Sequence, residues 1–238
     1  AEKPGDGALL DASIANPCRL YRLKAANKPD PVTRHLSTSE LRKIWRAVGD
    51  KNSGRIIKLQ LLTGCRVSEV CGMAESELDR EARNIWGAVG EWNLPRARNK
   101  TNRPHLIPLT EHMLRLIGEP NGEFIFPAKS KTGHTMSSGP TQCLKRVCKK
   151  LGIDGVTTHT MRYTFITNMA RLGVPIEIRN RLTNHKDSSI DGQYNQHDYP
   201  QEKTEALIRW GNSVDEILNN TAGKVASDIS LKRKQSEK

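Results

Sequence analysis

Apolar residues recur at intervals of three and four along most of this chain, and this spacing constrains the fold more than any other feature. It is typical of helices that bury one face in a core. The first such stripe consists of Leu41, Ile44, Trp45 and Val48. Ser37 and Glu40 have the spacing of a capping box, so we expect a helix to begin there and to end near Gly49.

The same spacing predicts helices in much of the remaining chain. The predicted segments are residues 55–64, 65–73, 111–119, 137–152, 159–172, 175–184 and 201–220. Pro175 is expected at the first helical position of its segment. Residues 84–89, 91–96 and 105–110 are instead short, with β-branched or aromatic residues between turn-like ones, and they predict strands. The predicted fold class is therefore α+β, mainly α-helical with a small antiparallel three-stranded sheet.

The chain divides into three parts by composition. Residues 1–35 have weak hydrophobic periodicity and predict an arm or interdomain linker. Residues 36–220 read as a single domain. Residues 221–238 are polar, end in LKRKQSEK and predict a mobile basic tail.

The charge of the chain points to a polyanionic partner. The net charge is +12 and the isoelectric point is about 9.7, which favours nucleic acid. No run of 18 apolar residues occurs, so we expect no membrane partner. The opening AEKPGDGALL lacks a signal-peptide pattern, and the five cysteines form no CxxC pair. A cytoplasmic protein with neither a disulfide framework nor a zinc site is the prediction.

The stretch HTMRYTF, residues 159–165, places His159 three residues before Arg162 on one helix face. The apolar Met161, Phe165 and Met169 run along the neighbouring face. We therefore expect the histidine and the arginine to lie on the side that the core does not use. An ordinary surface pair and a bound anion both explain this arrangement.

Further residues have side chains suited to phosphate chemistry. Arg66 follows a Thr-Gly break in TGCRVSE, with Glu69 three residues later. Lys100 begins the predicted turn and strand KTNRPHLIPL, and His185 precedes Tyr194 by nine residues. Guanidinium groups bind phosphate oxygens, a deprotonated tyrosine can attack phosphorus, and lysine or histidine can protonate a leaving oxygen. No acidic cluster or HExxH pattern suggests a metal, so we expect no cofactor.

At these residues the sequence resembles the tyrosine recombinases, the phage integrase family. The resemblance is carried by TGCRVSE, KTNRPHLIPL, HTMR, NH and QY, in the family's order and spacing. The stretches WNLPRARNKTNRPHLIPL and NHKDSSIDGQYNQHDY are most similar to integrases of satellite phages and genomic islands. The resemblance covers about residues 36–212 and implies the catalytic-domain fold of that family.

The resemblance implies site-specific DNA recombination that integrates or excises a mobile element through a covalent 3′-phosphotyrosyl intermediate, without metal or ATP. The implied roles are nucleophile for Tyr194, phosphate binding for Arg66, Arg162 and His185, general acid for Lys100, general base or acid for His159, and orientation of Arg66 for Glu69. The implied partners are duplex DNA at attachment sites, further copies of the chain in a homo-tetramer, and host DNA-bending proteins. A nucleoid-associated location follows.

The sequence departs from the family pattern in two respects. Asn184 stands before His185 where the family often has glycine, and asparagine can also adopt a left-handed turn. The family's N-terminal DNA-binding domain has no counterpart, so we expect a catalytic fragment. Cys65, beside the first arginine, is expected to be a small buried hydrophobe.

Each motif alone also has an ordinary structural explanation. Arg98 and Arg103 lie close to Lys100, and Tyr199 competes with Tyr194 as the nucleophile. The chain could also be a non-catalytic DNA-binding module with the same fold, and a type IB topoisomerase or a helix-turn-helix regulator are weaker alternatives. The intact set of six residues favours the recombinase, because a pure DNA-binding module has no use for the tyrosine.

Overall fold

The computed structural model describes residues 34–185 and 197–219. Tyr194, the basic tail and nearly all of the predicted arm lie outside these described residues. The helices are α2 (Thr38–Ala47), α3 (Asn52–Thr63), α4 (Val67–Cys71), α5 (Glu111–Ile117), α6 (Ser138–Leu151), α7 (Thr158–Arg171), α8 (Ile176–Leu182) and α10 (Pro200–Asn219). Every predicted helical segment is confirmed, although Pro175 precedes its helix as the N-cap rather than opening it.

The capping box at the start of α2 is present as its sequence predicts. The Ser37 hydroxyl accepts a hydrogen bond from the Glu40 backbone N–H at 3.3 Å, and the Glu40 carboxylate accepts one from the Ser37 N–H at 2.9 Å. Two backbone donors that a helix start leaves unpaired are thereby satisfied. Gly49 follows the end of the helix with φ +69°, close to the expected boundary.

Three antiparallel strands form one sheet in the order β1-β2-β3, namely β1 (Leu78–Arg83), β2 (Val89–Leu94) and β3 (His105–Leu109). The prediction of a strand at residues 84–89 is wrong. That segment is mostly the turn between β1 and β2, where the Asn84 side-chain oxygen accepts hydrogen bonds from the N–H groups of Trp86 and Ala88. Ile85, which suggested a strand, is 92% exposed at this turn.

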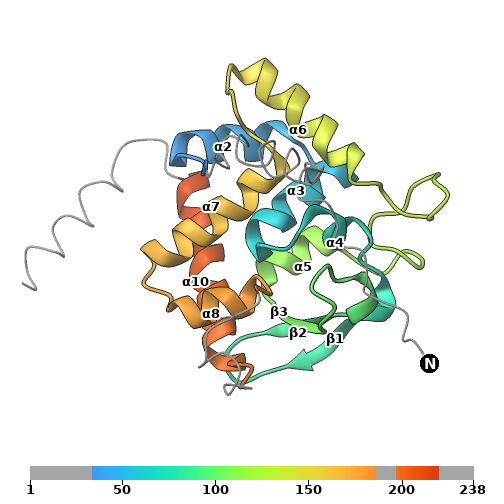
Figure 1. Ribbon diagram of the computed structural model, residues 1–238, viewed down its shortest axis with the longest axis vertical. Helices are drawn as coiled ribbons and strands as arrows, with labels where there is room; N and C mark the ends of the chain where they lie inside the picture. The colour runs from blue at the N-terminus through green and yellow to red at the C-terminus, as the bar shows by residue number, and fades with distance from the viewer. Residues whose placement is uncertain (1–33, 186–196, 220–238) are drawn as a thin grey trace, which may run out of the picture. The chain divides into compact units, whose positions relative to one another are not determined.

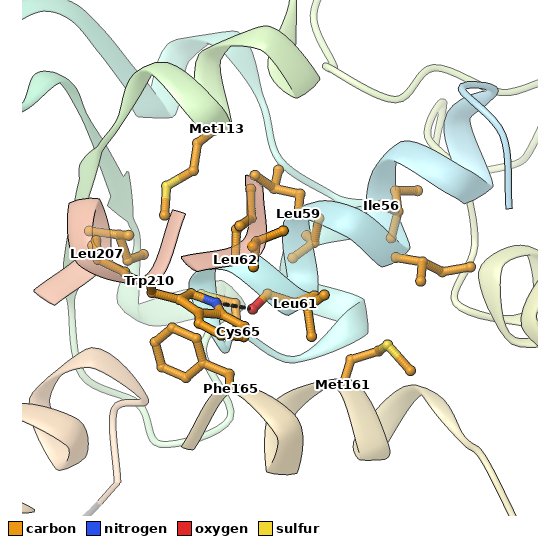
Figure 2. Packing of buried hydrophobic residues seen from close by; sticks show 14 of the residues in the cluster. Ile56, Leu59, Leu61, Leu62, Cys65, Met113, Met161, Phe165, Leu207 and Trp210 are labelled. Carbon is orange, nitrogen blue, oxygen red and sulfur yellow. Dashed lines mark hydrogen bonds between the residues drawn. The ribbon is translucent and has the colours of Figure 1, made fainter. Parts of the chain in front are cut away.

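Helix α3 lies at the centre of the helical layer, in contact with α4, α5, α6 and α7, and α10 packs against both α3 and β3 (Figure 1). Nine of the twelve residues of α3 are buried. Figure 2 shows the rings of Trp210 and Phe165 beside Leu61 and Leu62, and the Trp210 indole N–H donates a 2.9 Å hydrogen bond to the Leu61 carbonyl. Within residues 34–185 and 197–219, no helix combines the length and apolar character that a membrane span needs.

The end of α3 is fixed by close packing against α7. Gly64 ends the helix in a left-handed conformation at φ +70°, and a Cβ atom there would lie 2.4 Å from Cδ1 of the Phe165 ring. Both the backbone conformation and the lack of space therefore require glycine at this position. The chain then continues directly into Cys65 and Arg66, so this contact sets where the next segment begins.

Alanine substitutions at two helix-terminal glycines separate these two requirements. Gly49 has nearly the same φ as Gly64, but a Cβ atom added to it would have nothing within 4 Å. We expect Gly49→Ala to lower the free energy of unfolding by about 1 kcal/mol, the cost of the left-handed conformation alone. Gly64→Ala should cost about 1–3 kcal/mol more because Phe165 must move. Denaturant unfolding measures both, and equal losses would contradict this account of the α3–α7 contact.

Candidate active site

Arg66 is held in place by the carboxylate of Glu69. It is the N-cap residue of α4, and its backbone N–H and its Nη1 each donate a 2.7 Å hydrogen bond to a different Glu69 oxygen. Glu69 is buried, whereas the Arg66 side chain remains partly exposed. The pair therefore fixes the direction of the guanidinium and leaves part of it open to a ligand.

Arg162 is buried between the ends of two other helices. Its Nη1 donates to the Gly64 carbonyl at 2.6 Å, and its Nη2 donates to the Thr183 carbonyl at 2.5 Å. Gly64 ends α3 and Thr183 ends α8, so the cation lies at two negative helix C-termini. The expectation that the core does not use this face is wrong for Arg162, which is 4% exposed, and right for His159, which is exposed.

His185 lies just beyond α8 on a turn that Asn184 makes at φ +48°, the left-handed conformation expected there. Its Nδ1 lies 3.3 Å from the Thr183 hydroxyl oxygen. That hydroxyl already donates to the Arg179 carbonyl at 2.7 Å, so its oxygen accepts the Nδ1–H of His185. The other ring nitrogen, Nε2, is then free of this contact and can face a ligand.

The predicted residues lie close enough together to shift the pKa values of the two histidines. Burial lowers the pKa of His159, and the nearby charges of Arg162, Arg66 and Lys100 lower it further. Burial likewise lowers the pKa of His185, followed by the charges of Arg162 and Arg66 and by His159. Five residues that are spread over more than a hundred positions in the sequence therefore share one electropositive site.

Lys100 lies in the loop between β2 and β3, and its two sequence competitors differ from it in their contacts. Arg98 forms an ion pair with Glu77, so its guanidinium is already occupied by a carboxylate. Lys100 is exposed and makes no hydrogen bond or ion pair with the described residues. Arg103 is also exposed, but its charge does not act on the pKa of His159 as that of Lys100 does. The geometry thus favours Lys100 as the lysine of this site.

Tyr194 lies outside the described residues, which begin again three positions later at His197. Tyr199 is half-buried against the core, and its carbonyl accepts the first backbone hydrogen bond of α10 from Lys203. The buried Lys203 ammonium donates to Asp198 at 2.7 Å and to the Leu106 carbonyl at 2.9 Å. The start of α10 is therefore anchored to β3, the strand that follows the loop carrying Lys100.

The described residues offer cations and neutral donors rather than metal ligands. Among them, no three His, Cys, Asp or Glu side chains form a group that could hold a metal ion. Burial raises the pKa of the Cys65 thiol to about 12, so this cysteine packs as the small hydrophobe that its position predicts. An arrangement of two oriented guanidiniums, a lysine and two histidines suits an anion such as a phosphodiester.

Comparison with known proteins agrees with the resemblance in the motifs. Residues 34–201 match the sequence profile of the phage integrase family. The chain belongs to this family.

Relatives of this integrase-family chain include a prophage integrase and a tyrosine recombinase. Prophage integrase IntA of Escherichia coli strain K12 is 28% identical over 203 residues, which are 80% of this chain and 47% of the relative. Tyrosine recombinase XerA of Pyrococcus horikoshii is 25% identical over 73% of this chain and 60% of its own length. The chain thus spans about half to three fifths of the curated relatives it matches.

Solved structures share the fold of this integrase-family chain. The integrase from mycobacterium phage Brujita aligns with a TM-score of 0.61 and 20% identity over 87% of this chain and 65% of that one. XerH recombinase, solved bound to its difH substrate before cleavage, aligns with a TM-score of 0.51 and 14% identity over 68% of this chain and 50% of that one. These neighbours confirm the mainly helical fold with its small sheet.

The site also contains a histidine that the motifs did not single out. His105 begins β3, and its Nε2–H donates a 3.0 Å hydrogen bond to the Arg181 carbonyl in α8. Burial, then the nearby charge of Lys203, lowers the pKa of His105 to about 3, with smaller effects from Arg162 and Arg66. It is therefore neutral at physiological pH and links β3 to the helix that leads into His185. The pattern HLIPL gave no signal for this, because its partner is a backbone carbonyl.

His105 should make the protein sensitive to acid. Its folded pKa of about 3 lies below the ordinary 6.5, so the unfolded state binds the extra proton as the pH falls from 6.5 towards 3. Stability is then complete above 6.5 and is lost through this window, by at most about 5 kcal/mol.

We expect His105→Gln, whose Nε2 amide can still donate to the Arg181 carbonyl, to flatten the dependence of unfolding free energy on pH. Denaturant unfolding at about pH 7 and about pH 4 compares the two proteins, because carboxylates contribute equally to both. Parallel profiles for the wild type and the variant would show that His105 does not resist protonation in the folded state.

Proposed function

We propose that this chain is the catalytic part of a site-specific DNA recombinase that cleaves and rejoins strands through a tyrosine. The observation that carries the proposal is the mutual effect of the candidate residues. Burial and then the charges of both arginines lower the pKa values of both exposed histidines, and Arg162 joins the end of α3 that leads to Arg66 to the end of α8 that leads to His185. The family membership and the fold shared with DNA-bound XerH support the same conclusion.

The proposed reaction transfers the 3′-phosphoryl group of the DNA from the 5′-oxygen of the next nucleotide to the oxygen of a tyrosine. The Tyr194 oxygen attacks the scissile phosphorus and forms a 3′-phosphotyrosyl bond while the bond to the 5′-oxygen breaks. His159, with its lowered pKa, is neutral at pH 7 and can take the tyrosine proton, and Lys100 gives a proton to the leaving 5′-oxygen. The 5′-hydroxyl of a second DNA strand then attacks the 3′-phosphotyrosyl bond, which rejoins the DNA and releases the tyrosine without ATP.

The remaining residues of the site bind the phosphate. Arg66, oriented by Glu69, and Arg162, oriented by two helix ends, hold the non-bridging oxygens. The Nε2 of His185 donates a further hydrogen bond to the phosphate when the ring is protonated beside the bound anion, because only an imidazolium has a proton on both nitrogens. The phosphorane gains a negative charge over the ground state, so fixed cations stabilise it more strongly than the substrate. No cofactor takes part in this scheme.

The proposed partners follow from the same chemistry. The substrate is duplex DNA at an attachment site of a mobile element, and the basic chain suits it. Recombination of two duplexes breaks and rejoins four strands, one at each active site, so we propose a homo-tetramer on two DNA segments, with host DNA-bending proteins as further components. The basic tail is proposed to support that assembly.

A covalent-adduct assay tests the nucleophile. The protein is incubated with nicked duplex DNA carrying a candidate attachment site, with EDTA present, and a denaturing gel shows whether a protein–DNA band forms. We expect the band with the wild type and with Tyr199→Phe, and its loss with Tyr194→Phe, since phenylalanine has no hydroxyl.

Two other results would change the conclusion. A band that survives Tyr194→Phe and disappears with Tyr199→Phe would move the nucleophile to Tyr199. DNA binding with no band for any variant would favour the alternative, a non-catalytic DNA-binding module of the same fold.

DNA binding itself should depend steeply on salt. Lysine and arginine contacts to phosphates release condensed counterions, so the affinity for duplex DNA should fall at least tenfold between about 50 and about 200 mM salt. A gel-shift or fluorescence titration measures it. An affinity that stays flat over this range would contradict a phosphate-binding surface.

A further inference from the structure

Arg98 connects the loop that carries Lys100 to the helix that orients Arg66. It lies in the short turn η2 (Arg96–Arg98), and its Nε and Nη2 donate to the two oxygens of Glu77 at 2.6 and 2.5 Å. Its Nη1 donates to the Glu69 carbonyl at 3.3 Å. Three parts of the chain therefore meet at one guanidinium.

The acceptor of this ion pair is itself fixed. Glu77 is buried in η1 (Glu75–Glu77), and its Oε2 also accepts a 2.9 Å hydrogen bond from the indole N–H of Trp92. Trp92 is fully buried on the central strand β2. The Arg98 side chain is thus tied to the sheet interior as well as to α4.

The structure leaves space for Arg98 by placing a glycine beside it. Gly72 has an ordinary φ of −93°, so its backbone conformation suits any residue. A Cβ atom at this position would lie 2.7 Å from Nη1 of Arg98, which is too close. Glycine at 72 therefore serves the approach of the guanidinium to α4 rather than a turn.

Hydrogen bonds from the Asn99 side chain close the loop beyond Arg98 into a turn. The Asn99 side-chain oxygen accepts hydrogen bonds from the N–H and the hydroxyl of Thr101, and its side-chain nitrogen donates to the Arg103 carbonyl at 2.9 Å. Lys100 lies inside this closed turn. The position of its ammonium then depends on how the base of the turn is held, and Arg98 holds that base.

We propose that Arg98 is a positioning residue that fixes Lys100 relative to Arg66, through the Glu77 ion pair and the contact with the Glu69 carbonyl. The inference rests on the proposed function, in which Lys100 protonates the leaving 5′-oxygen. The general acid and one phosphate-binding arginine then move as one body. Loss of this link displaces the proton donor while leaving the DNA contacts in place.

The chain contains a matched control for this ion pair. Arg80 on β1 donates through Nε and Nη2 to the two oxygens of Glu75, which lies in the same short turn as Glu77. Its Nη1 donates to the Gly118 carbonyl at the end of α5. The pattern of three contacts is the same, but it leads away from α4 and the Lys100 loop.

The test compares two DNA substrates that differ in one leaving atom. One has the natural 5′-oxygen at the scissile phosphate, and the other has a bridging 5′-sulfur, which leaves as a thiolate and needs no proton because thiols are far more acidic than alcohols. Lys100→Ala serves as the reference for a missing general acid. Arg98→Lys keeps the charge beside Glu77 but loses the planar fork, and Gly72→Ala displaces Arg98 with every charge retained.

We expect Arg98→Lys and Gly72→Ala to slow cleavage of the oxygen substrate at least about tenfold and to cleave the sulfur substrate at nearly the wild-type rate. Arg80→Lys, the same substitution in the control ion pair, should match the wild type on both substrates, and DNA affinity should be the same for all four proteins. A defect that merely weakens the fold would affect both substrates alike.

Two results would overturn the inference. Equal losses on both substrates would show that Arg98 acts through the phosphate-binding residues or the fold, and unchanged rates on both would show that it positions nothing. The general-acid role of Lys100 in the proposed function is tested separately, by the cleavage rates of Lys100→Ala on the two substrates. If Lys100→Ala cleaves the sulfur substrate as slowly as the oxygen substrate, Lys100 is not the general acid. Arg98 then has no general acid to position, and the inference is wrong.

Discussion

The buried guanidinium of Arg162 is the interaction on which the rest of the site depends. It bridges two carbonyl groups that end α3 and α8, and no carboxylate of the described residues bonds to it directly. Carbonyl groups at helix C-termini carry partial negative charge, which compensates part of the cost of burying a cation. Removal of this side chain would leave two buried acceptors unpaired, at about 1–3 kcal/mol each.

This bridge also explains why the candidate residues gather in one place. Arg66 follows the last residue of α3 by three positions, and His185 follows the last residue of α8 by the same number. Arg162 holds both ends against α7, which carries His159 on the turn before it. The site is thus assembled from the ends of helices that pack in the core, and the packing of Gly64 against Phe165 sets one of those ends.

The sequence could predict parts of this arrangement that depend on local spacing. The helices, the Arg66–Glu69 pair and the left-handed turn at Asn184 all follow from neighbours within a few positions. Strand β1 was missed because LDREAR has no apolar alternation, and its pairing with β2 holds it in place. Local spacing does not predict the burial of Arg162 or the ion pair of Arg98, because their partners lie 21 or more positions away.

The positive charges of the site disfavour one another and make it receptive to an anion. Burial lowers the pKa of Arg162, and the charge of Arg66 lowers it further against the opposing effects of Cys65, Glu69 and Tyr163, so the two cations disfavour each other without an anion. Burial, and then the same field, lowers the pKa values of His159 and His185, because a further proton would add positive charge to the cluster. Under the proposed function, a phosphodiester supplies one negative charge and its pentavalent transition state supplies two. The repulsion already present among the fixed cations is then relieved most in the transition state, which is the condition for lowering the barrier rather than only binding DNA.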